Sequence, residues 1–534
     1  MVHSNFNATA AEALAVAIRK RIRGEVRFDF RGWPPRAVNA ACDRPVPIGV
    51  VVPRDVNDVV ETVAACRRHD TPVIPRSGRG GVAEHQHRSA VIIDMSKHLG
   101  GLLAVDAERL RAVVEPGCAL ESLCWQVEKH RLSFGLAPSI HDHRTLGAVL
   151  GRGTCCPDSS MAGARAADHI HRLDILTYDG LRMTVGPTSE LELETIIREG
   201  GRRGEIYAGL KALRDKYADT VRARFPRVPR RVSGYAIDQL LPENGFNVAR
   251  ALIGTEATCV IVLHAELHLV PSPPHRTLLL LGCSDICKAA DHNAELMGAA
   301  PLHFEAVDER FVQFAKAGRI ELGAWDLLPE GRGWLIVEFG GETREESDGK
   351  ARQLMGKLRG KPGIRAMKLL TGPREKALLW SVRAAGLAAD WTLASRTTQA
   401  VWGDAAVHPH DIGPFLRDYR GLLDKYGYRC AMYGHFGQGC IHSRVDFSSR
   451  EGGRYWHAFL DEATDLVLRY NGSLSARRSG GTARVDLLPR LYGDTLVQAF
   501  REFKAIWDPR NRMNPSWVAD RFPYAEPPNL KRAM

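Results

Sequence analysis

Two histidines flank a short turn late in the chain, and their spacing could bring two imidazoles to one point. His435 and His442 are seven residues apart in the stretch His-Phe-Gly-Gln-Gly-Cys-Ile-His. On strand-like segments joined by a turn, such side chains can converge, and neutral imidazoles are ligands for a divalent metal. Two hydrogen-bonded histidines inside a packed domain would explain the same spacing. The pair therefore indicates either a chemical site or a structural one.

Two glycine-rich stretches could hold an anion through backbone N–H groups, because glycine permits left-handed backbone and close approach. They lie at 75–81 and 138–155, and neither has the spacing of a Rossmann fingerprint or a P-loop. Each alone is typical of a structural turn, whereas two in one domain favour a long diphosphate cofactor. The residues predicted to bind it here are Arg76, Ser77, Gly78, Arg79, Gly80, Gly81, Pro138, Ser139, Thr145, Gly147, Gly151, Gly153, Thr154 and Cys155.

Short strands and helices alternate around these stretches, which is typical of an α+β or α/β domain. Valines at helical spacing predict a helix over 56–69, with Asp55 as its N-cap. The segment 251–270 is predicted to be strand-rich, and the proline cluster at 271–274 after it predicts a domain boundary. Further strands are predicted at 48–52, 72–75, 90–95, 173–178, 277–281, 334–338 and 364–369.

The composition is that of a globular chain that can bury a large core. Of 534 residues, 44% are hydrophobic and 25% are charged, and the formal net charge is +11. The basic residues lack the aromatic pattern of a nucleic-acid module, so no nucleic-acid partner is expected. The 11 cysteines lack zinc or iron–sulfur spacing, which favours reduced thiols and a cytoplasmic protein. No apolar run predicts a signal peptide or a transmembrane segment.

The order of the glycine stretches and the strands around them resembles the FAD domain of the vanillyl-alcohol oxidase and p-cresol methylhydroxylase superfamily. The stretches at 254–258, 380–383, 435–442 and 507–515 resemble the branch of FAD-linked D-lactate, glycolate and D-2-hydroxyglutarate dehydrogenases. The resemblance covers about residues 40–520. It implies an α+β protein with a bipartite FAD-binding domain of the p-cresol methylhydroxylase type and an α+β cap that holds the substrate.

This resemblance implies four parts of the chain. We expect an N-terminal helical extension at 1–44, the FAD-binding domain at 45–274, the cap domain at 275–480, and a C-terminal segment at 481–534 that returns to the FAD-binding domain.

The resemblance also implies roles for single residues. Glu256 and Asn514 are expected beside FAD, Arg383 near a substrate carboxylate, and Tyr433 as a hydrogen-bond donor to the substrate. No histidine stands at the usual position of covalent flavin attachment, so we expect FAD to be noncovalent.

The largest departure from this branch is an arginine pair. Where its members have a metal-binding glutamate followed by a basic histidine, this sequence has Arg477 and Arg478. A guanidinium repels a cation and does not deprotonate near neutral pH, so it replaces neither a metal ligand nor a base. We expect no metal, with His435 and His442 as the residual ligands if one binds. The arginines either grip substrate carboxylates or mark a lost reaction, and a solvated surface pair is the simpler alternative.

The sequence therefore predicts an FAD-dependent oxidoreductase that oxidises a small polar substrate bearing a carboxylate, a 2-hydroxy acid or a relative, by hydride transfer to flavin. His435 or His442, free of metal, would take the proton. The alternatives are a biosynthetic tailoring flavoenzyme acting on another class of substrate, or a flavin-binding protein without turnover. Oxygen, a quinone or a separate iron–sulfur partner would accept the electrons.

Overall fold

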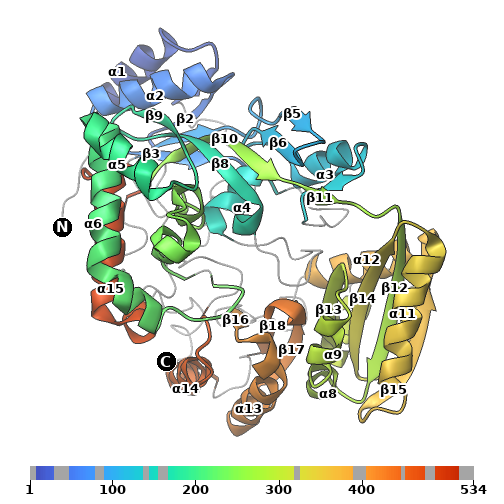
Figure 1. Ribbon diagram of the computed structural model, residues 1–534. Coiled ribbons are helices and arrows are strands. Elements are labelled where there is room, and N and C mark those ends of the chain that lie inside the picture. The colour runs from blue at the N-terminus through green and yellow to red at the C-terminus, as the bar shows by residue number, and fades with distance from the viewer. Residues whose placement is uncertain are drawn as a thin grey trace.

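The computed structural model describes residues 8–28, 47–78, 90–135, 144–153, 166–231, 233–317, 325–388, 404–446, 452–474 and 487–515. The chain forms two regions, the first over 8–271 and the second over 275–474, followed by a C-terminal helix (Figure 1). The elements of the first region are α1 (Ala8–Arg19), β1 (Glu25–Arg27), β2 (Gly49–Val52), α2 (Val56–Arg68), β3 (Val73–Arg76), β4 (Val91–Asp94), β5 (Leu102–Asp106), β6 (Arg111–Val114), α3 (Leu120–Glu128), β7 (Leu132–Ser133), α4 (Leu146–Arg152), η2 (Ala166–His169), β8 (Ile170–Leu176), β9 (Arg182–Val185), α5 (Glu190–Glu199), α6 (Gly201–Arg224), η3 (Ile237–Leu240), η4 (Pro242–Asn244), α7 (Val248–Ala251), β10 (Ile261–His268) and β11 (Val270–Pro271).

The elements of the second region and of the C-terminal segment are β12 (His275–Cys283), α8 (Ile286–Ala290), α9 (Asn293–Gly298), β13 (His303–Asp308), α10 (Glu309–Ala317), η5 (Trp325–Leu327), β14 (Gly333–Gly341), α11 (Arg344–Leu358), β15 (Ile364–Leu370), α12 (Pro373–Ala388), β16 (Asp404–Ala406), η6 (Pro409–Asp411), α13 (Ile412–Lys425), β17 (Arg429–Gly434), η7 (Phe436–Gln438), β18 (Cys440–Asp446), α14 (Gly452–Arg469) and α15 (Leu488–Trp507).

The first region contains two main sheets. In the four-stranded sheet, ordered β1-β2-β4-β3, the β4 strand pairs in parallel with β2 and with β3. Between β2 and β3 runs α2, whose first turn is capped by the Asp55 carboxylate accepting from the Asp58 backbone N–H at 3.0 Å. Val59 and Val63 of α2 are buried against this sheet. The helix and cap predicted from the valine spacing are confirmed.

The second sheet of the first region is antiparallel, in the order β5-β6-β10-β8-β9. Buried and half-buried residues alternate along β10, as expected for a strand with one face on the core. The prediction that all of 251–270 is strand-rich was wrong in its first half. The backbone has positive φ at Gly254, Glu256 and Ala257, so it turns there and cannot extend before Ile261.

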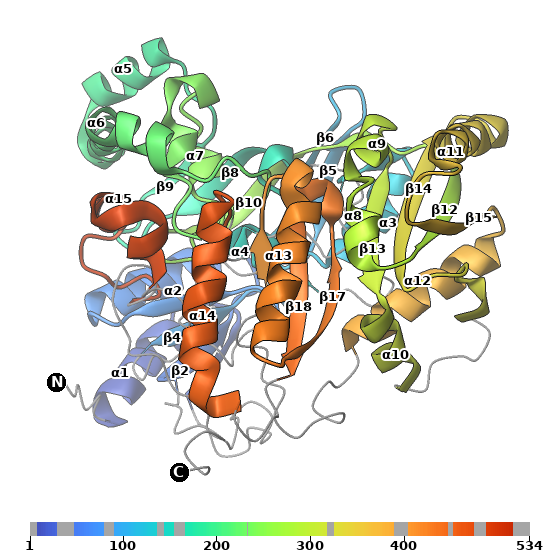
Figure 2. The same ribbon diagram turned by 90° about the horizontal axis from the view of Figure 1, so that it is seen from below.

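The second region is built on one seven-stranded sheet in the order β15-β12-β14-β13-β17-β18-β16, antiparallel at each pairing that the structure describes. Its inner strands β12 and β14 are buried almost throughout, because helices pack on them. Figure 1 shows β15 and β12 at the outer side of the molecule, with β16, β18 and β17 nearest the first region. Figure 2 shows α13 lying along β17 and β18.

The C-terminal helix α15 packs beside α6 of the first region (Figure 1). The Tyr492 hydroxyl donates to the Ser233 carbonyl at 2.6 Å, and Lys216 pairs with Glu502 at 2.9 Å. Beyond α15 the chain reaches the edge of the four-stranded sheet, where the Asn514 N–H donates to the Val73 carbonyl at 2.9 Å. This mixture of sheets and helices confirms the α+β fold class, while the predicted domain boundaries stay a prediction.

In the part of the chain that the structure describes, no helix combines the length and the apolar character needed to cross a bilayer.

Candidate active site

The two glycine-rich stretches meet where β3 ends and α4 begins. The Thr145 hydroxyl lies 3.1 Å from the Ser77 hydroxyl, which joins the first stretch to the second. A Cβ on Gly147 would stand 2.6 Å from the Ser77 hydroxyl oxygen, and one on Gly78 would stand 3.1 Å from that of Thr145. Thr145 also caps α4 by accepting from the Ala148 N–H. A side chain at Gly147 would therefore collide with Ser77, and one at Gly78 would crowd Thr145.

The far end of α4 meets a second turn that contains glycine. Gly153 closes the helix in the left-handed conformation, with φ of 62°, and Gly254 faces it with φ of 83°. A Cβ on Gly153 would lie 2.9 Å from the Gly254 Cα. The Glu256 N–H donates to the Gly151 carbonyl at 2.8 Å, so three of the predicted cofactor-binding residues share one backbone junction.

Asn514 completes this junction from the C-terminal segment. Its side-chain N–H donates to the Glu256 carbonyl at 2.8 Å, and its backbone is in the left-handed region with φ of 39°. Its amide oxygen is buried and has no hydrogen-bond partner among the described residues. A buried acceptor without a donor is costly, so this oxygen is suited to accept a hydrogen bond from a ligand.

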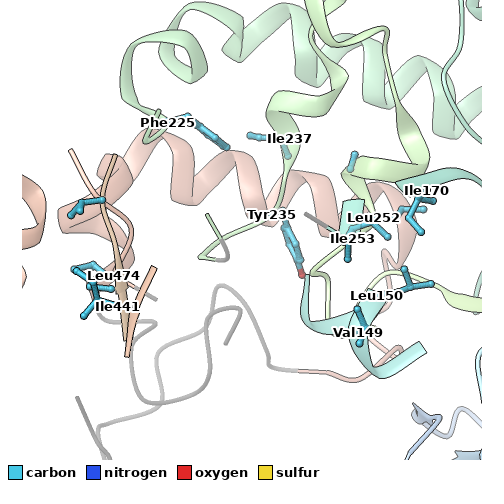
Figure 3. Close-up of a cluster of buried hydrophobic side chains, with 14 of the residues drawn as sticks. Val149, Leu150, Ile170, Phe225, Tyr235, Ile237, Leu252, Ile253, Ile441 and Leu474 are labelled. Atoms are coloured by element: carbon cyan, nitrogen blue, oxygen red, sulfur yellow. The ribbon is translucent and has the colours of Figure 1, made fainter. Parts of the chain in front are cut away.

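Apolar packing holds this junction in place. Figure 3 shows Leu150 of α4 beside Leu252, Ile253 and Ile170, with Ile441 across from them on a strand of the second region. These side chains belong to one buried cluster that runs through both regions. The regions are also joined by a polar contact, because the buried Arg230 guanidinium donates to the Gln438 side chain at 3.1 Å.

The predicted histidine pair lies in the second region, on the strands nearest the first. His435 follows β17, and His442 lies within β18, with the short η7 turn between them. The turn needs Gly439, whose φ is 69° and whose Cβ would collide with the Val407 carbonyl oxygen. The two rings are 5.9 Å apart between centroids and nearly perpendicular, and both are buried. The structure therefore brings the pair together.

His442 lies between an acid and a thiol. Its Nδ1 is 2.7 Å from the Asp404 carboxylate of β16, which is its direct cross-strand neighbour. Its Nε2 is 3.3 Å from Sγ of Cys440. Burial alone would lower the pKa of His442, but the negative charges of Cys440 and Asp404 outweigh burial and raise it. The surroundings of His442 therefore favour its protonated form.

His435 has a different acid behind it. Its Nδ1 lies 3.4 Å from Oε1 of Glu305, and Nε2 of His303 lies 3.1 Å from the same oxygen. Burial raises the pKa of Glu305, although nearby histidines oppose that effect. The His303 ring also packs edge-on against Trp380, with centroids 4.8 Å apart. Glu305 thus lies within ion-pair distance of two buried histidines, His303 in β13 and His435 just after β17.

Two family models match the chain. The FAD binding domain matches residues 47–186, and the C-terminal domain of FAD linked oxidases matches residues 272–518. The chain belongs to the FAD-linked oxidases. The first region therefore contains the FAD-binding domain, and the seven-stranded region is its cap.

Similar proteins agree with this assignment. The D-2-hydroxyglutarate dehydrogenase of Pseudomonas putida is 24% identical over 97% of this chain and 53% of its own length. The glycolate oxidase subunit GlcD of Bacillus subtilis is 22% identical, with 88% of each chain covered. This chain spans about half the length of the D-2-hydroxyglutarate dehydrogenases that it matches.

A solved structure of p-cresol methylhydroxylase with substrate bound has the same fold. It gives a TM-score of 0.62 at 14% identity and covers 96% of this chain and 98% of that one. The predicted family and the p-cresol methylhydroxylase type of fold are confirmed.

The described residues of the FAD-binding domain fit the family's cofactor, FAD. Glycines at both ends of α4 let protein segments approach where a Cβ would collide, and Asn514 supplies a buried acceptor without a hydrogen-bond partner among the described residues. No group of three His, Cys, Asp or Glu side chains suited to a metal ion occurs within the described ranges.

Sequence reasoning missed Glu305, Asp404, His303 and Cys440. The sequence did contain an indication of Glu305, because a carboxylate in the buried stretch His-Phe-Glu-Ala-Val-Asp at 303–308 requires a partner.

Tyr433 was predicted, and its ring lies 4.8 Å from that of His442. Arg383 lies on α12, but its side chain is outside the described residues. The predicted residues wholly outside the described ranges are Arg79, Gly80, Gly81, Pro138, Ser139, Thr154, Cys155, Arg477 and Arg478.

Proposed function

We propose that this FAD-linked oxidase oxidises a small 2-hydroxy acid, or a related substrate that carries a carboxylate, to the corresponding 2-oxo product. The names of its relatives, a D-2-hydroxyglutarate dehydrogenase and a glycolate oxidase subunit, support this class of substrate. Because the chain spans about half the length of the D-2-hydroxyglutarate dehydrogenase, the proposal names a class of acid and not a single acid. Bound FAD supplies the acceptor for the hydride that leaves the substrate carbon.

The observation that carries the proposal is the contact between His435 and Glu305. Oxidation of an alcohol requires a group that removes the hydroxyl proton, and an imidazole backed by a carboxylate is suited to that task. Glu305 lies 3.4 Å from Nδ1 of His435, so we assign the proton-accepting role to the opposite nitrogen. The Glu305 carboxylate then offsets the positive charge that develops on the ring.

The neighbouring His442 has a separate task in this scheme. Because Asp404 and Cys440 favour its protonated form, His442 carries positive charge at the same buried point. A substrate carboxylate or a developing alkoxide is stabilised by such a charge. Of the two histidines that the sequence left open as proton acceptors, the contacts therefore favour His435.

We further propose that arginines take the place of a metal in holding the substrate. Arg383, Arg477 and Arg478 are the candidates, with Tyr433 as a hydroxyl donor beside His442. A guanidinium binds a carboxylate through two parallel hydrogen bonds and carries its charge at all physiological pH values. This assignment rests on residue type and family position.

The cofactor-binding assignments remain part of the proposal. Ser77, Gly78, Thr145 and Gly147 would lie along one part of FAD. Gly151, Gly153, Glu256 and Asn514 form a second group, linked by their own backbone contacts.

We propose that FAD is bound noncovalently and that the site holds no metal. Acid denaturation followed by filtration should release the yellow colour, and elemental analysis should find no stoichiometric zinc or manganese. Colour that stays with the protein, or a metal lost in His435→Ala, would contradict these two points.

The function is tested by anaerobic titration of the purified yellow protein with D- and L-lactate, glycolate and D-2-hydroxyglutarate. We expect at least one acid to bleach the flavin absorbance. A flavin that dithionite reduces but no acid reduces would overturn the proposal. It would favour a tailoring enzyme with another substrate or a binding protein without turnover. Reoxidation by oxygen, a quinone or an iron–sulfur protein then identifies the acceptor.

We also propose a cytoplasmic setting, which the cysteines support. Those in the described ranges are all free thiols, and most are buried. Reduced thiols persist in a reducing compartment.

A further inference from the structure

Cys440 lies at one end of a hydrogen-bonded row that the family assignment does not explain. Cys440 and His442 are two residues apart on β18, so their side chains point to the same face of the sheet. Sγ of Cys440 is 3.3 Å from Nε2 of His442, and Nδ1 of His442 is 2.7 Å from the Asp404 carboxylate. The order thiol, imidazole, carboxylate matches the arrangement that activates a nucleophile, with the base oriented by a third group.

The thiol differs from the other buried cysteines of the described chain. Burial raises the pKa of Cys66, Cys259 and Cys430, and nothing nearby compensates sufficiently. At Cys440 the sulfur instead contacts an imidazole, with Nε2 of His442 at 3.3 Å. Cys430 is the closest comparison, because it lies on the adjacent strand β17 and its thiol donates to the Ala431 carbonyl.

Arg230 adds a second positive charge from the FAD-binding domain. It is buried, and its guanidinium donates to Gln438, two residues from Cys440. Two cations beside one thiol favour the thiolate, which is the reactive form, and they also attract an anionic ligand. The thiol therefore lies where the two halves of the molecule meet.

We propose that Cys440 is a nucleophile that bonds reversibly to the carbonyl carbon of a small 2-oxo acid, with His442 as its proton donor and Asp404 as the residue that orients His442. The sulfur electron pair forms the S–C bond while the carbonyl π bond breaks. The carbonyl oxygen takes the proton from Nε2 of His442, and the product is a neutral hemithioketal beside the substrate carboxylate. No oxidant, reductant or other reactant is consumed.

The choice of a 2-oxo acid rests on the proposed function, because that class is its product. The reactivity of the thiol rests on the three side chains alone. An adduct would hold the product at the site and compete with the next substrate, so this thiol would make the enzyme sensitive to its own product.

The first experiment measures thiol reactivity in the FAD-loaded protein. Limiting iodoacetamide is added, and peptide fragmentation locates the label at Cys440 or at Cys430, which lies on the neighbouring strand. We expect Cys440 to react at least about tenfold faster than Cys430. Equal labelling of the two cysteines, or labelling of Cys430 alone, would overturn the proposal.

Variants of the other two side chains test their roles. His442→Gln removes the imidazole that contacts the sulfur and should slow labelling of Cys440 to the rate of Cys430. Asp404→Asn should slow it by a smaller factor, and Asp404→Glu should restore part of the loss because it returns a carboxylate. A structural role for Asp404 would give the opposite ranking, since asparagine is the closer match in size.

The second experiment observes the adduct itself. Pyruvate labelled with carbon-13 at its carbonyl carbon is added to the FAD-loaded protein and followed by NMR. We expect a new signal in the tetrahedral region that is absent in Cys440→Ser and retained in Cys430→Ser. No such signal, or one that persists in Cys440→Ser, would overturn the adduct. If this signal appears while no 2-hydroxy acid reduces the flavin, the proposed function fails and the thiol site stands.

Discussion

The FAD-binding half and the cap hold their functional groups in different ways. In the FAD-binding half the candidate site is made of backbone, with Gly153 and Gly254 in contact and Asn514 fixed by main-chain partners. In the cap it is made of buried side chains that carry charge, such as Glu305 against His435. The first set of contacts is made by groups that do not titrate, whereas the second is made by side chains that do.

This difference predicts where the molecule is sensitive to pH. Asp308 ends β13 of the cap and is buried, with its carboxylate accepting from the Phe311 N–H at 2.7 Å. Burial raises its pKa from 3.8 to about 7. Because its pKa is higher in the folded state than in the unfolded state, Asp308 contributes stability to the fold at low pH. This contribution is fully present below the unfolded pKa of 3.8 and is lost as the pH rises through about 7. The difference between the folded and unfolded pKa values corresponds to at most about 4 kcal/mol in the free energy of unfolding.

The melting temperature of the wild type and of Asp308→Asn should be compared from pH 4 to pH 8. Because asparagine does not titrate, we expect the wild type to lose stability relative to the variant across this window. A difference between the two melting temperatures that does not change with pH would show that Asp308 does not titrate near 7.

Backbone geometry is tested by Gly153→Ala. The added Cβ would stand 2.9 Å from the Gly254 Cα, at a φ of 62° that alanine adopts at a cost. A combined cost of about 3 kcal/mol would weaken FAD binding roughly a hundredfold. Equilibrium dialysis of the apoprotein with FAD measures it.

Gly349→Ala is the matched control in the cap. It lies in α11, where a Cβ meets nothing within 4 Å. Alanine should stabilise that helix by about 0.5–1 kcal/mol and leave FAD binding unchanged. Equal FAD affinity in the two variants would mean that the Gly153 junction lies away from the cofactor.

The arginine pair tests whether the charge of the cap extends to substrate binding. In Arg478→Ala one charge-assisted hydrogen bond is lost, which is worth about 1.5–3 kcal/mol or roughly ten- to hundredfold in affinity. Arg478→Glu should weaken binding further, because like charges repel. The measurement is the concentration of acid that half-reduces the flavin. Unchanged values in both variants would place Arg478 on a solvated surface.

The two halves also differ in how far the sequence predicts them. The glycine stretches and the valine-spaced helix are local patterns, so their residues and elements could be read directly. The partners of the histidines could not, because β13 and β16 are brought beside His435 and His442 only by the order of strands in the cap sheet. A missing glutamate at the expected position therefore suggested a site without an acid, while the structure places Glu305 and Asp404 against the histidines from other strands.

The central claim is that His435 is the proton acceptor of the cap and that the FAD-binding half serves mainly to hold the cofactor. It is tested most directly by the rate of flavin reduction in His435→Gln, measured by anaerobic stopped flow with the best acid substrate. His264→Gln is the matched control, because His264 forms a similar 3.1 Å pair with Asp174 in the FAD-binding half. We predict a rate roughly 10²- to 10⁴-fold lower in His435→Gln, with full flavin content, and an unchanged rate in His264→Gln. A wild-type rate in His435→Gln would contradict the account.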